Sequence, residues 1–360
     1  MEIERYLNLG LVIPESGPSG IFGPSCATSA QLAVEELNGA GGILGRELRV
    51  TTIDGGLAPA LVGARVRRAV DDGEVDLLVG WHTSAVRRAL VREVAGRVPY
   101  FYTAVYEGGE TAPGVYLTGE TPQGQLIPAV EWMAVQEGVR SWMVIGSDYV
   151  WPRRTAQAVG LRFARAGDPR LPVSIDTAHF LPLGTEEFGG VLDEVERSGV
   201  DGVLLMLLGN DAVEFNRQFA ARRLHDRCVR LSPLMDENML LASGDEATQR
   251  IYSVSGFFES MGTAHSLDFE SRYLRRFGRN SPPLASPGES CYEGVGLMSQ
   301  LVRHASSIEV GDINDRIHTP LRYDSPRGEV VFDGRHLGQD VYLARADGLE
   351  FDVLAQVASA

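Results

Sequence analysis

TPQGQ (residues 121–125) is the stretch that decides the fold, because the same order of strands and helices stands on both sides of it. Before it, short apolar segments rich in β-branched residues alternate with longer segments of helical periodicity, and the alternation restarts directly after it. Such alternation is typical of parallel sheets whose crossovers are helices. Two units in series predict an α/β protein with two doubly wound parallel-sheet lobes that are joined by hinge strands.

The expected elements follow from this pattern. In the first unit we expect strands at 7–14, 47–54, 75–80, 98–103 and 115–119, and helices at 26–39, 59–72 and 84–95. In the second we expect strands at 141–147, 173–182, 202–207 and 229–234, and helices at 123–137, 152–166, 186–198 and 210–223. Beyond them we expect a strand at 252–258, helices at 266–277 and 286–305, and an antiparallel meander at 328–334, 339–345 and 351–357. The predicted lobes are residues 1–120 with 253–327, and 121–252 with 328–360, and the predicted ligand cleft lies between them.

Composition narrows the class of protein. A length of 360 residues agrees with two domains. Hydrophobic residues make up 44% of the chain, yet no apolar run reaches the roughly 18 residues of a membrane span, so we expect no membrane insertion. A net charge of −15 disfavours direct nucleic-acid binding. The chain contains no lysine, which excludes a phosphate-loop lysine and a Schiff-base lysine.

The cysteines and the N-terminus bear on cofactors and location. Cys26, Cys228 and Cys291 form no zinc or redox motif and are expected to be buried free thiols, and we expect neither a metal nor another cofactor. The opening segment MEIERYLNLGLVIP has none of the features of a signal peptide, which predicts a cytoplasmic protein. A secreted protein whose signal had been removed would look the same and would be extracellular or periplasmic.

Polar turns that follow strands are the candidate ligand sites, because doubly wound sheets bind small molecules at the carboxyl ends of their strands. In the first unit, two such turns are GWHTS (80–84) and the segment 100–110, and Ser84 stands at an expected helix N-cap. The alternative is a simple cap and a tyrosine-rich loop that buries its own rings. The candidate binding residues in these turns are Trp81, His82, Thr83, Ser84, Tyr102, Thr103, Ala104, Val105 and Tyr106.

Two further turns in the second unit supply the opposite side of the predicted cleft. GSDYVWPRR (146–154) contributes Tyr149 and Trp151, and PLMDENML (233–240) contributes Asp236 and Glu237. Asp148 and the acidic pair are equally suited to helix capping and to interaction with the helix dipole. The four turns contain no hydrolase, metalloprotease or dinucleotide motif, so we expect a site that holds a ligand without reaction and has no catalytic residues.

The chain resembles the type I periplasmic-binding-protein family, in its leucine/isoleucine/valine-binding branch. Within that branch it is most similar to the amide-sensing regulators of amidase operons and to the urea and short-chain-amide binding components of ABC transporters. The likeness covers essentially the whole chain and is carried by LGLVIPESGPSG (9–20), AVEELNGAGGILGRELRV (33–50), LLVGWHTSAVRRAL (77–90), YEG (106–108) and IGSDYVWPR (145–153).

The resemblance implies roles for several residues. Ser84 and the loop from Tyr102 to Val105 would hydrogen-bond the polar head of the ligand, and Tyr149 and Trp151 would close over it. This chain departs from the amide sensors at His82 and Trp151, where they carry tyrosines, and in TAV (103–105), which lacks their prolines. The implied ligand is a short-chain amide, a urea-like molecule or an amino acid.

Three functions follow as hypotheses. The first is a cytoplasmic sensor that closes on its ligand and signals to a regulatory protein, and a homodimer is left open. The second is the extracellular solute-binding component of an ABC importer, whose partner would be the permease. The third is an amide-processing enzyme that uses His82 and Asp148.

Overall fold

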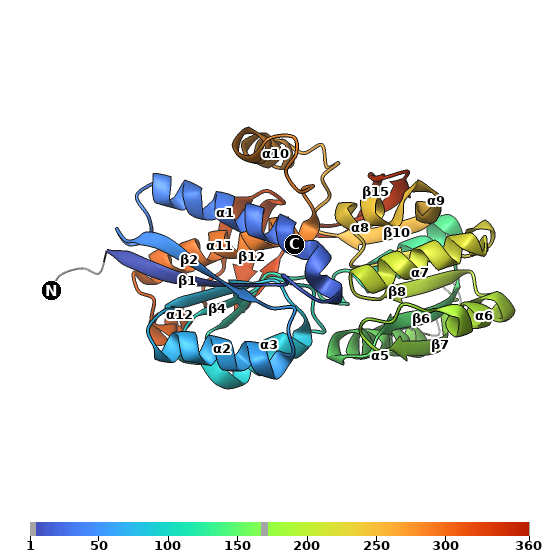
Figure 1. The fold of residues 1–360 in the computed structure, drawn as a ribbon, viewed down its shortest axis with the longest axis horizontal. Coiled ribbons are helices and arrows are strands. Elements are labelled where there is room, and N and C mark those ends of the chain that lie inside the picture. Colours follow the sequence, from blue (N-terminus) through green and yellow to red (C-terminus); the bar gives the residue numbers. More distant parts are fainter. Residues whose placement is uncertain (1–4, 167–171, 360) are drawn as a thin grey trace.

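The computed structural model describes residues 5–166 and 172–359. Its strands form two sheets that lie beside each other along the long axis of the molecule (Figure 1). We call the first sheet with its covering helices lobe 1, and the second sheet with its helices lobe 2. The expected α/β architecture of two mostly parallel sheets is confirmed.

Lobe 1 is built on an eight-stranded sheet of order β11-β12-β13-β5-β4-β3-β1-β2. Its strands are β1 (Tyr6–Ile13), β2 (Glu47–Asp54), β3 (Leu77–Gly80), β4 (Tyr100–Tyr102), β5 (Val115–Leu117), β11 (Leu321–Ser325), β12 (Gly328–Asp333) and β13 (His336–Gly338). Its helices are η1 (Pro18–Phe22), α1 (Gly23–Gly39), α2 (Pro59–Asp71), α3 (Ser84–Val94), α10 (Ala264–Phe277), α11 (Ser286–Ala305) and α12 (Val310–Arg316). The strands β3, β4 and β5 are buried along their whole length because helices cover both faces, as parallel sheets require.

Lobe 2 is built on a seven-stranded sheet of order β15-β14-β10-β9-β8-β6-β7. Its strands are β6 (Ser141–Ser147), β7 (Ser174–Leu181), β8 (Gly202–Met206), β9 (Val229–Ser232), β10 (Ile251–Ser255), β14 (Val341–Asp347) and β15 (Glu350–Ala358). Its helices are α4 (Leu126–Trp132), the π-helical turn η2 (Met133–Glu137), α5 (Val150–Ala166), α6 (Gly189–Ser198), α7 (Asn210–Ala221), η3 (Leu224–Asp226), α8 (Glu237–Ser243) and α9 (Asp245–Thr248).

The sheet order corrects the expected course of the last part of the chain. Strand β12, which was expected to lie in the second lobe with 328–360, pairs with β11 and β13 in the first sheet. Only β14 and β15 return to lobe 2, and β10 keeps residues 253–255 there as well. An alternating pattern identifies an antiparallel strand but not the sheet to which it belongs. The sequence therefore did not show that β12 joins the first sheet while β14 and β15 join the second.

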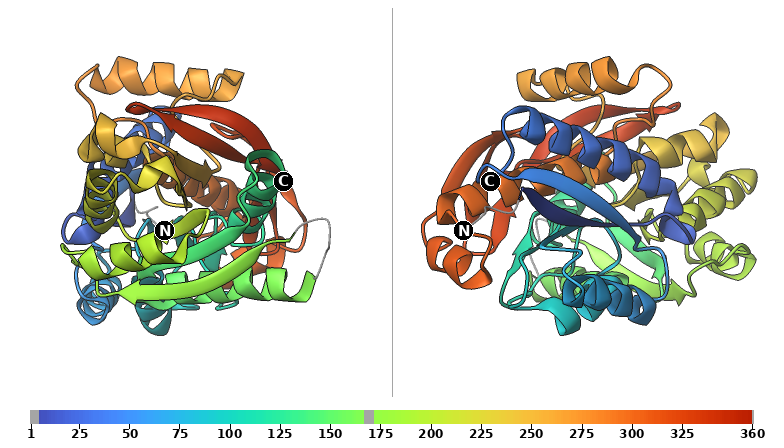
Figure 2. Two further views of the ribbon diagram at one scale, coloured as in Figure 1. Left: turned by 90° about the vertical axis from the view of Figure 1, so that its right-hand side faces the viewer. Right: turned by 60° about the vertical axis from the view of Figure 1, so that its left-hand side comes forward.

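Helix α10 forms an outer layer of lobe 1. Both views in Figure 2 show it (orange, top) outside the rest of the molecule. Ion pairs of Arg272 with Glu36 and of Arg276 with Glu35, each at 2.5 Å, attach it to α1. None of the helices in the part of the chain that the structure describes combines the length and apolar character of a membrane crossing.

Three segments cross between the lobes, at 118–125, 256–263 and 339–340. The buried guanidinium of Arg327 joins them. It donates to Gln339 in the third crossing and lies 3.5 Å from the carboxylate of Glu120 in the first, while Glu120 accepts from the backbone N–H of Gly256 in the second at 2.8 Å. A second carboxylate, Glu289 of α11, also accepts from Arg327. The crossings therefore share one buried ionic cluster, which limits how the lobes move relative to each other.

The lobes also touch away from these crossings. Gly209 precedes α7 in lobe 2 with φ of +52°, and a Cβ at this position would lie 2.1 Å from the carbonyl oxygen of Pro18 in lobe 1. Only glycine allows both this backbone conformation and this approach. The contact shows that the structure holds the lobes close together.

Candidate functional site

Two adjoining cavities lie between the lobes and share Trp81, Val105 and Leu234 among their lining residues. We call them together the inner cleft. Their volumes are about 10 and 20 Å³, which is room for about one water molecule each. A larger ligand therefore requires the lobes to separate before it enters, and the lining residues to leave more room than they do here once it is bound. Besides the shared residues, the lining consists of His82, Thr83, Ser84, Tyr102, Ala104, Tyr149 and Leu208 in one cavity, and Glu120, Pro233, Met235, Asp236, Ser255, Ser286, Pro287 and Ser290 in the other.

The turn before α3 places two hydroxyl groups at the inner cleft. Thr83, not Ser84, is the N-cap: its side chain accepts a hydrogen bond from the backbone N–H of Val86 at 3.4 Å. Ser84 is the first helical residue, and its buried hydroxyl accepts from a guanidinium nitrogen of Arg87 at 3.2 Å. Because Thr83 caps the helix, the Ser84 hydroxyl is not needed as a cap, and Ser84 lines the cleft.

His82 is held in a neutral form by its surroundings. Its Nε2 lies 3.0 Å from the hydroxyl of Tyr100, and its carbonyl oxygen accepts from the hydroxyl of Tyr102 at 2.8 Å. Burial lowers the pKa of His82 to about 3. Asp148 is exposed and pairs with Arg153 at 2.6 Å, and no interaction joins it to the imidazole among the described residues. The structure therefore does not bring His82 and Asp148 together as a base and its orienting partner, which the hypothesis of an amide-processing enzyme required.

Tyr149 forms the lobe 2 side of the same cavity, opposite Ser84 and Tyr102. Trp151 is almost fully buried behind it, with its ring 6.2 Å from that of Tyr149. Trp81 packs in the same way in lobe 1, with its ring 4.6 Å from Phe22 while it lines both cavities. Trp151 is thus placed to support Tyr149, and it is not among the residues that line the cleft.

Asp236 presents a buried carboxylate to the inner cleft. It is the N-cap of α8, and one carboxylate oxygen accepts from the backbone N–H of Met239 at 2.9 Å. No arginine or histidine forms an ion pair with it in the described part of the chain. Burial raises the pKa of Asp236 to about 7, because its negative charge is removed from water without a cation nearby.

The remaining predicted residues lie at the edge of the site or outside it. Glu237 accepts from the backbone N–H of Glu259 at 2.9 Å and lines a separate surface groove. Tyr106 lines a larger outer cavity between α3 and α5. Thr103 is buried, its hydroxyl has no hydrogen-bond partner among the described residues, and it does not line the inner cleft.

Several lining residues were not predicted. Leu208 follows β8, Leu234 and Met235 follow β9, and Ser255 ends β10, so the rule that points to strand ends would also have found them. Ser286 and Ser290 belong to the first turns of α11, and because the element predicted directly before this helix is another helix (266–277) and not a strand, the same rule could not have found them.

Comparison with known proteins agrees with this geometry. A family model described as periplasmic binding protein matches residues 7–350. The Leu/Ile/Val-binding protein homolog 6 of Brucella melitensis is 23% identical over 224 residues, which cover 60% of this chain and 56% of that protein. Homolog 8 of Brucella abortus is 25% identical over 225 residues, which cover 59% of this chain and 54% of the relative. The matched region thus spans little more than half of these curated relatives.

Two solved structures are similar along nearly the whole chain. One is a solute-binding protein of an ABC transporter from Rhodopseudomonas palustris in complex with 3,4-dihydroxybenzoic acid, with a TM-score of 0.84 and 18% identity over 99% of this chain and 98% of that one. The other is the branched-chain amino acid transporter substrate-binding protein LivJ from Streptococcus pneumoniae in complex with isoleucine, with a TM-score of 0.82 and 18% identity over 97% and 99%. At this level of identity the likeness shows a common fold.

Proposed function

Because the chain belongs to the periplasmic binding protein family, we propose that it binds a small solute in the inner cleft and delivers it to an ABC importer outside the cytoplasm. The family is one of non-enzymatic binding proteins. Solved proteins of similar fold bind solutes for ABC transporters, which supports this importer role over the cytoplasmic amide sensor. The permease is the proposed partner.

The proposed ligand is a small zwitterion of amino-acid type. Asp236 carries this proposal: it is a buried carboxylate that faces the inner cleft and has no cation partner among the described residues. A ligand ammonium would neutralise it, because a buried charge without a partner is costly. Ser84 and Tyr149 line the other cavity, and their hydroxyls are suited to donate hydrogen bonds to the ligand's carboxylate.

Asp236 also distinguishes two other ligand classes from the zwitterion. A short amide or urea would donate N–H groups to Asp236 without neutralising its charge, so we expect weaker binding. An aromatic acid such as the 3,4-dihydroxybenzoic acid bound by the Rhodopseudomonas protein brings a second negative charge and no cation to neutralise Asp236, so we expect it not to bind.

The proposed motion is a hinge closure in which lobe 1 and lobe 2 act as two domains. The small volume of the inner cleft and the contact between Gly209 and Pro18 support a closed arrangement. The three crossing segments are the proposed hinges. Closure removes water from the site, so each hydrogen bond to the ligand counts more.

A thermal-unfolding screen tests the proposal. Amino acids, short amides, ureas and benzoates are each added to the purified protein, and a ligand that binds only the folded state raises the melting temperature. We expect a shift with one or more amino acids, confirmed by calorimetric titration with one site per chain. Binding of a benzoate in place of every amino acid would contradict the assignment of ligand class.

Removing single hydroxyls from the cleft tests its location. We expect Ser84→Ala and Tyr149→Phe each to weaken binding of the ligand found in the screen by roughly 1–3 kcal/mol, because each leaves a buried polar group of the ligand unpaired. The control is Ser281→Ala, whose hydroxyl donates to the carbonyl of Gly278 and which is not among the residues that line the cleft. Calorimetric affinities for the three variants decide the matter, and wild-type binding by both cleft variants would place the site elsewhere.

A further inference from the structure

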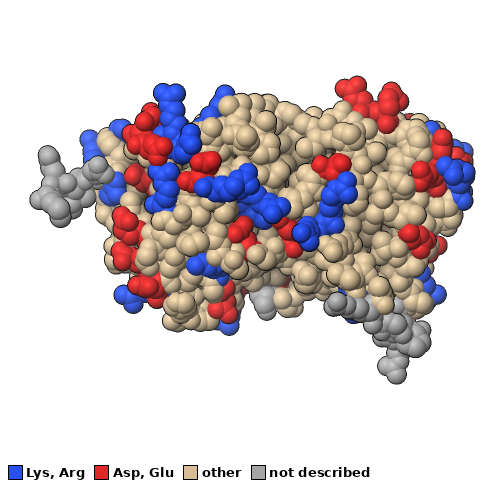
Figure 3. Space-filling model, turned by 90° about the horizontal axis from the view of Figure 1, so that it is seen from below, with Lys and Arg blue, Asp and Glu red and all other residues tan. Residues whose placement is uncertain are grey.

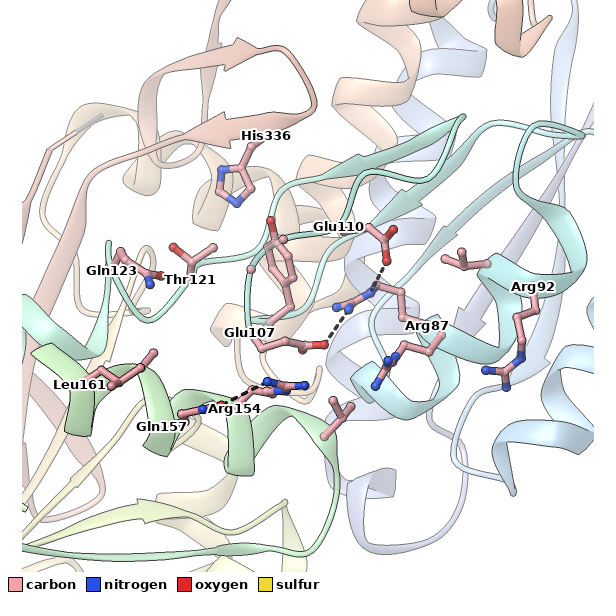
Figure 4. Close-up of a pocket in the computed structure, with 17 residues that line it drawn as sticks. Arg87, Arg92, Glu107, Glu110, Thr121, Gln123, Arg154, Gln157, Leu161 and His336 are labelled. Carbon is pink, nitrogen blue, oxygen red and sulfur yellow. Dashed lines mark hydrogen bonds and ion pairs between the residues drawn. The ribbon is translucent and has the colours of Figure 1, made fainter. Parts of the chain in front are cut away.

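A larger cavity, outside the inner cleft, is lined with arginines from both lobes. It has a volume of about 1200 Å³ and lies between α3, the loop 106–110, the first crossing and α5 (Figure 4). We call it the outer cavity. Its charged lining residues are Arg87, Arg88, Arg92, Arg154, Glu107 and Glu110.

One of these arginines is already neutralised. Arg87 is buried and pairs with Glu107 at 2.8 Å and with Glu110 at 3.3 Å, as the dashed lines in Figure 4 show. The cluster of Arg87 with both glutamates of the lining carries a net charge of −1 (one arginine against two glutamates), so it offsets only part of the charge of the other three arginines. Arg87 therefore belongs to the structure of lobe 1 and is not available to a ligand.

The other three arginines are exposed and have no acidic partner among the described residues. Arg88 and Arg92 project from α3, and Arg154 projects from α5 and donates only to the neutral side chain of Gln157 at 3.2 Å. Such a cluster is unusual in a chain with 48 acidic and 33 basic residues. Figure 3, which views the molecule from below, on the side where Figure 1 places α2, α3 and α5, shows basic side chains near the centre of this face with some acidic side chains beside them.

The arrangement brings arginines of the two lobes to one cavity. Helix α3 belongs to lobe 1 and α5 to lobe 2, and they contact each other in this structure. Bringing the lobes together therefore brings like charges together, and their repulsion is reduced by a counter-charge between them. Guanidinium groups bind carboxylate and phosphate oxygens with charge-assisted, often paired hydrogen bonds.

We propose that the outer cavity binds a small multivalent oxyanion, of di- or tricarboxylate type, between Arg88 and Arg92 of lobe 1 and Arg154 of lobe 2. The bound anion stabilises the closed arrangement of the lobes. By thermodynamic reciprocity it also raises affinity for the ligand of the inner cleft. The site is separate from that cleft, so this proposal does not depend on the identity of the transported solute.

Citrate is a suitable probe, with acetate and chloride at the same ionic strength as controls. Calorimetry gives its affinity for the full chain at pH 7.5, and small-angle X-ray scattering gives the radius of gyration with and without it. We expect citrate to bind and to lower the radius of gyration, and acetate and chloride to do neither. Arg92→Gln and Arg154→Gln should each reduce citrate affinity about tenfold or more, the effect of losing one charge-assisted contact.

Two control variants distinguish citrate binding in the outer cavity from general charge screening and from binding in the inner cleft. Arg162→Gln lies on the same helix as Arg154 but pairs with Glu131 at 2.5 Å, so it should bind citrate within about twofold of wild type. Asp236→Asn alters only the inner cleft and should leave citrate binding unchanged. Equal losses of citrate affinity in Arg162→Gln and Arg154→Gln would show general charge screening and overturn the proposal. Loss of citrate affinity in Asp236→Asn would overturn it as well. So would a loss of citrate affinity in only one of the two variants Arg92→Gln and Arg154→Gln.

Discussion

Asp236→Asn is expected to lower affinity for an amino-acid ligand by about a hundredfold or more, because it removes the only charge proposed to meet the ligand's ammonium. The substitution keeps the size of the side chain and its capping oxygen, since asparagine is as good an N-cap as aspartate. The effect on binding is therefore separate from an effect on α8. Titration calorimetry above pH 7.5, where the wild-type carboxylate is ionised, measures it.

The same variant is expected to be more stable than the wild type without ligand at pH 8. The folded-state pKa of about 7 lies above the value of roughly 3.9 for an unfolded aspartate, so folding favours the protonated form. The wild type consequently loses stability as pH rises from about 4 to 7, and the loss stays constant above that. Asparagine carries no such penalty, so we expect a gain on the order of 2–4 kcal/mol at pH 8 and almost none at pH 4.

Denaturant unfolding at both pH values checks the gain, with Glu246→Gln, an exposed acidic residue of α9, as the control. A second readout is the pH dependence of wild-type binding, which should weaken by up to tenfold per unit as pH falls below 7. Normal ligand affinity in Asp236→Asn would show that this carboxylate does not contact the ligand. Loss of stability at pH 8 would show that its charge is compensated in the folded protein.

Gly209→Ala is expected to prevent full closure of the lobes. The added Cβ would lie 2.1 Å from the carbonyl oxygen of Pro18 in the opposite lobe, a distance that no real contact reaches. Relief requires the lobes to separate, because the obstacle is backbone on both sides. We expect ligand affinity to fall by at least tenfold, about 1.4 kcal/mol, and the radius of gyration with saturating ligand to exceed that of the wild type.

The control for this variant is Gly199→Ala in the same lobe. Gly199 also has a left-handed backbone, with φ of +66°, but no atom lies within 4 Å of its virtual Cβ. Both alanines therefore stand at a positive φ, although the ψ of −116° at Gly209 suits alanine less well than the ψ of 22° at Gly199, and only Gly209→Ala meets the other lobe. Equal affinities in the two variants would mean that the contact between Gly209 and Pro18 is not needed for binding.

The central parts of both sheets could be predicted from the sequence because each buried parallel strand is a short apolar run. Leu77–Gly80 and Gly202–Met206 are buried at every position, and both were expected as strands. The edges were harder. The three-residue strand His336–Gly338 has no periodicity to read, and Gly328–Asp333 alternates equally well for either sheet.

The site could be predicted where it follows strands and not where it depends on packing between distant segments. Ser84, Tyr102 and Tyr149 were expected at one cleft, and the structure brings them to one cavity. The sequence did not show that Thr83 caps α3, because both hydroxyl residues suit that position. It also did not show that Arg327 would join three crossings, since its partners lie up to 207 residues away, at Glu120.

The insertion of β13 between β12 and β5 has a consequence for the newly made chain. Strand β5 is complete once residue 117 has left the ribosome, but its partner at 336–338 follows more than two hundred residues later. Until then the growing polypeptide exposes an unpaired strand edge, the kind of surface on which nascent chains associate wrongly. The amino-terminal half of the molecule thus reaches its native state only after nearly the whole protein has been synthesised.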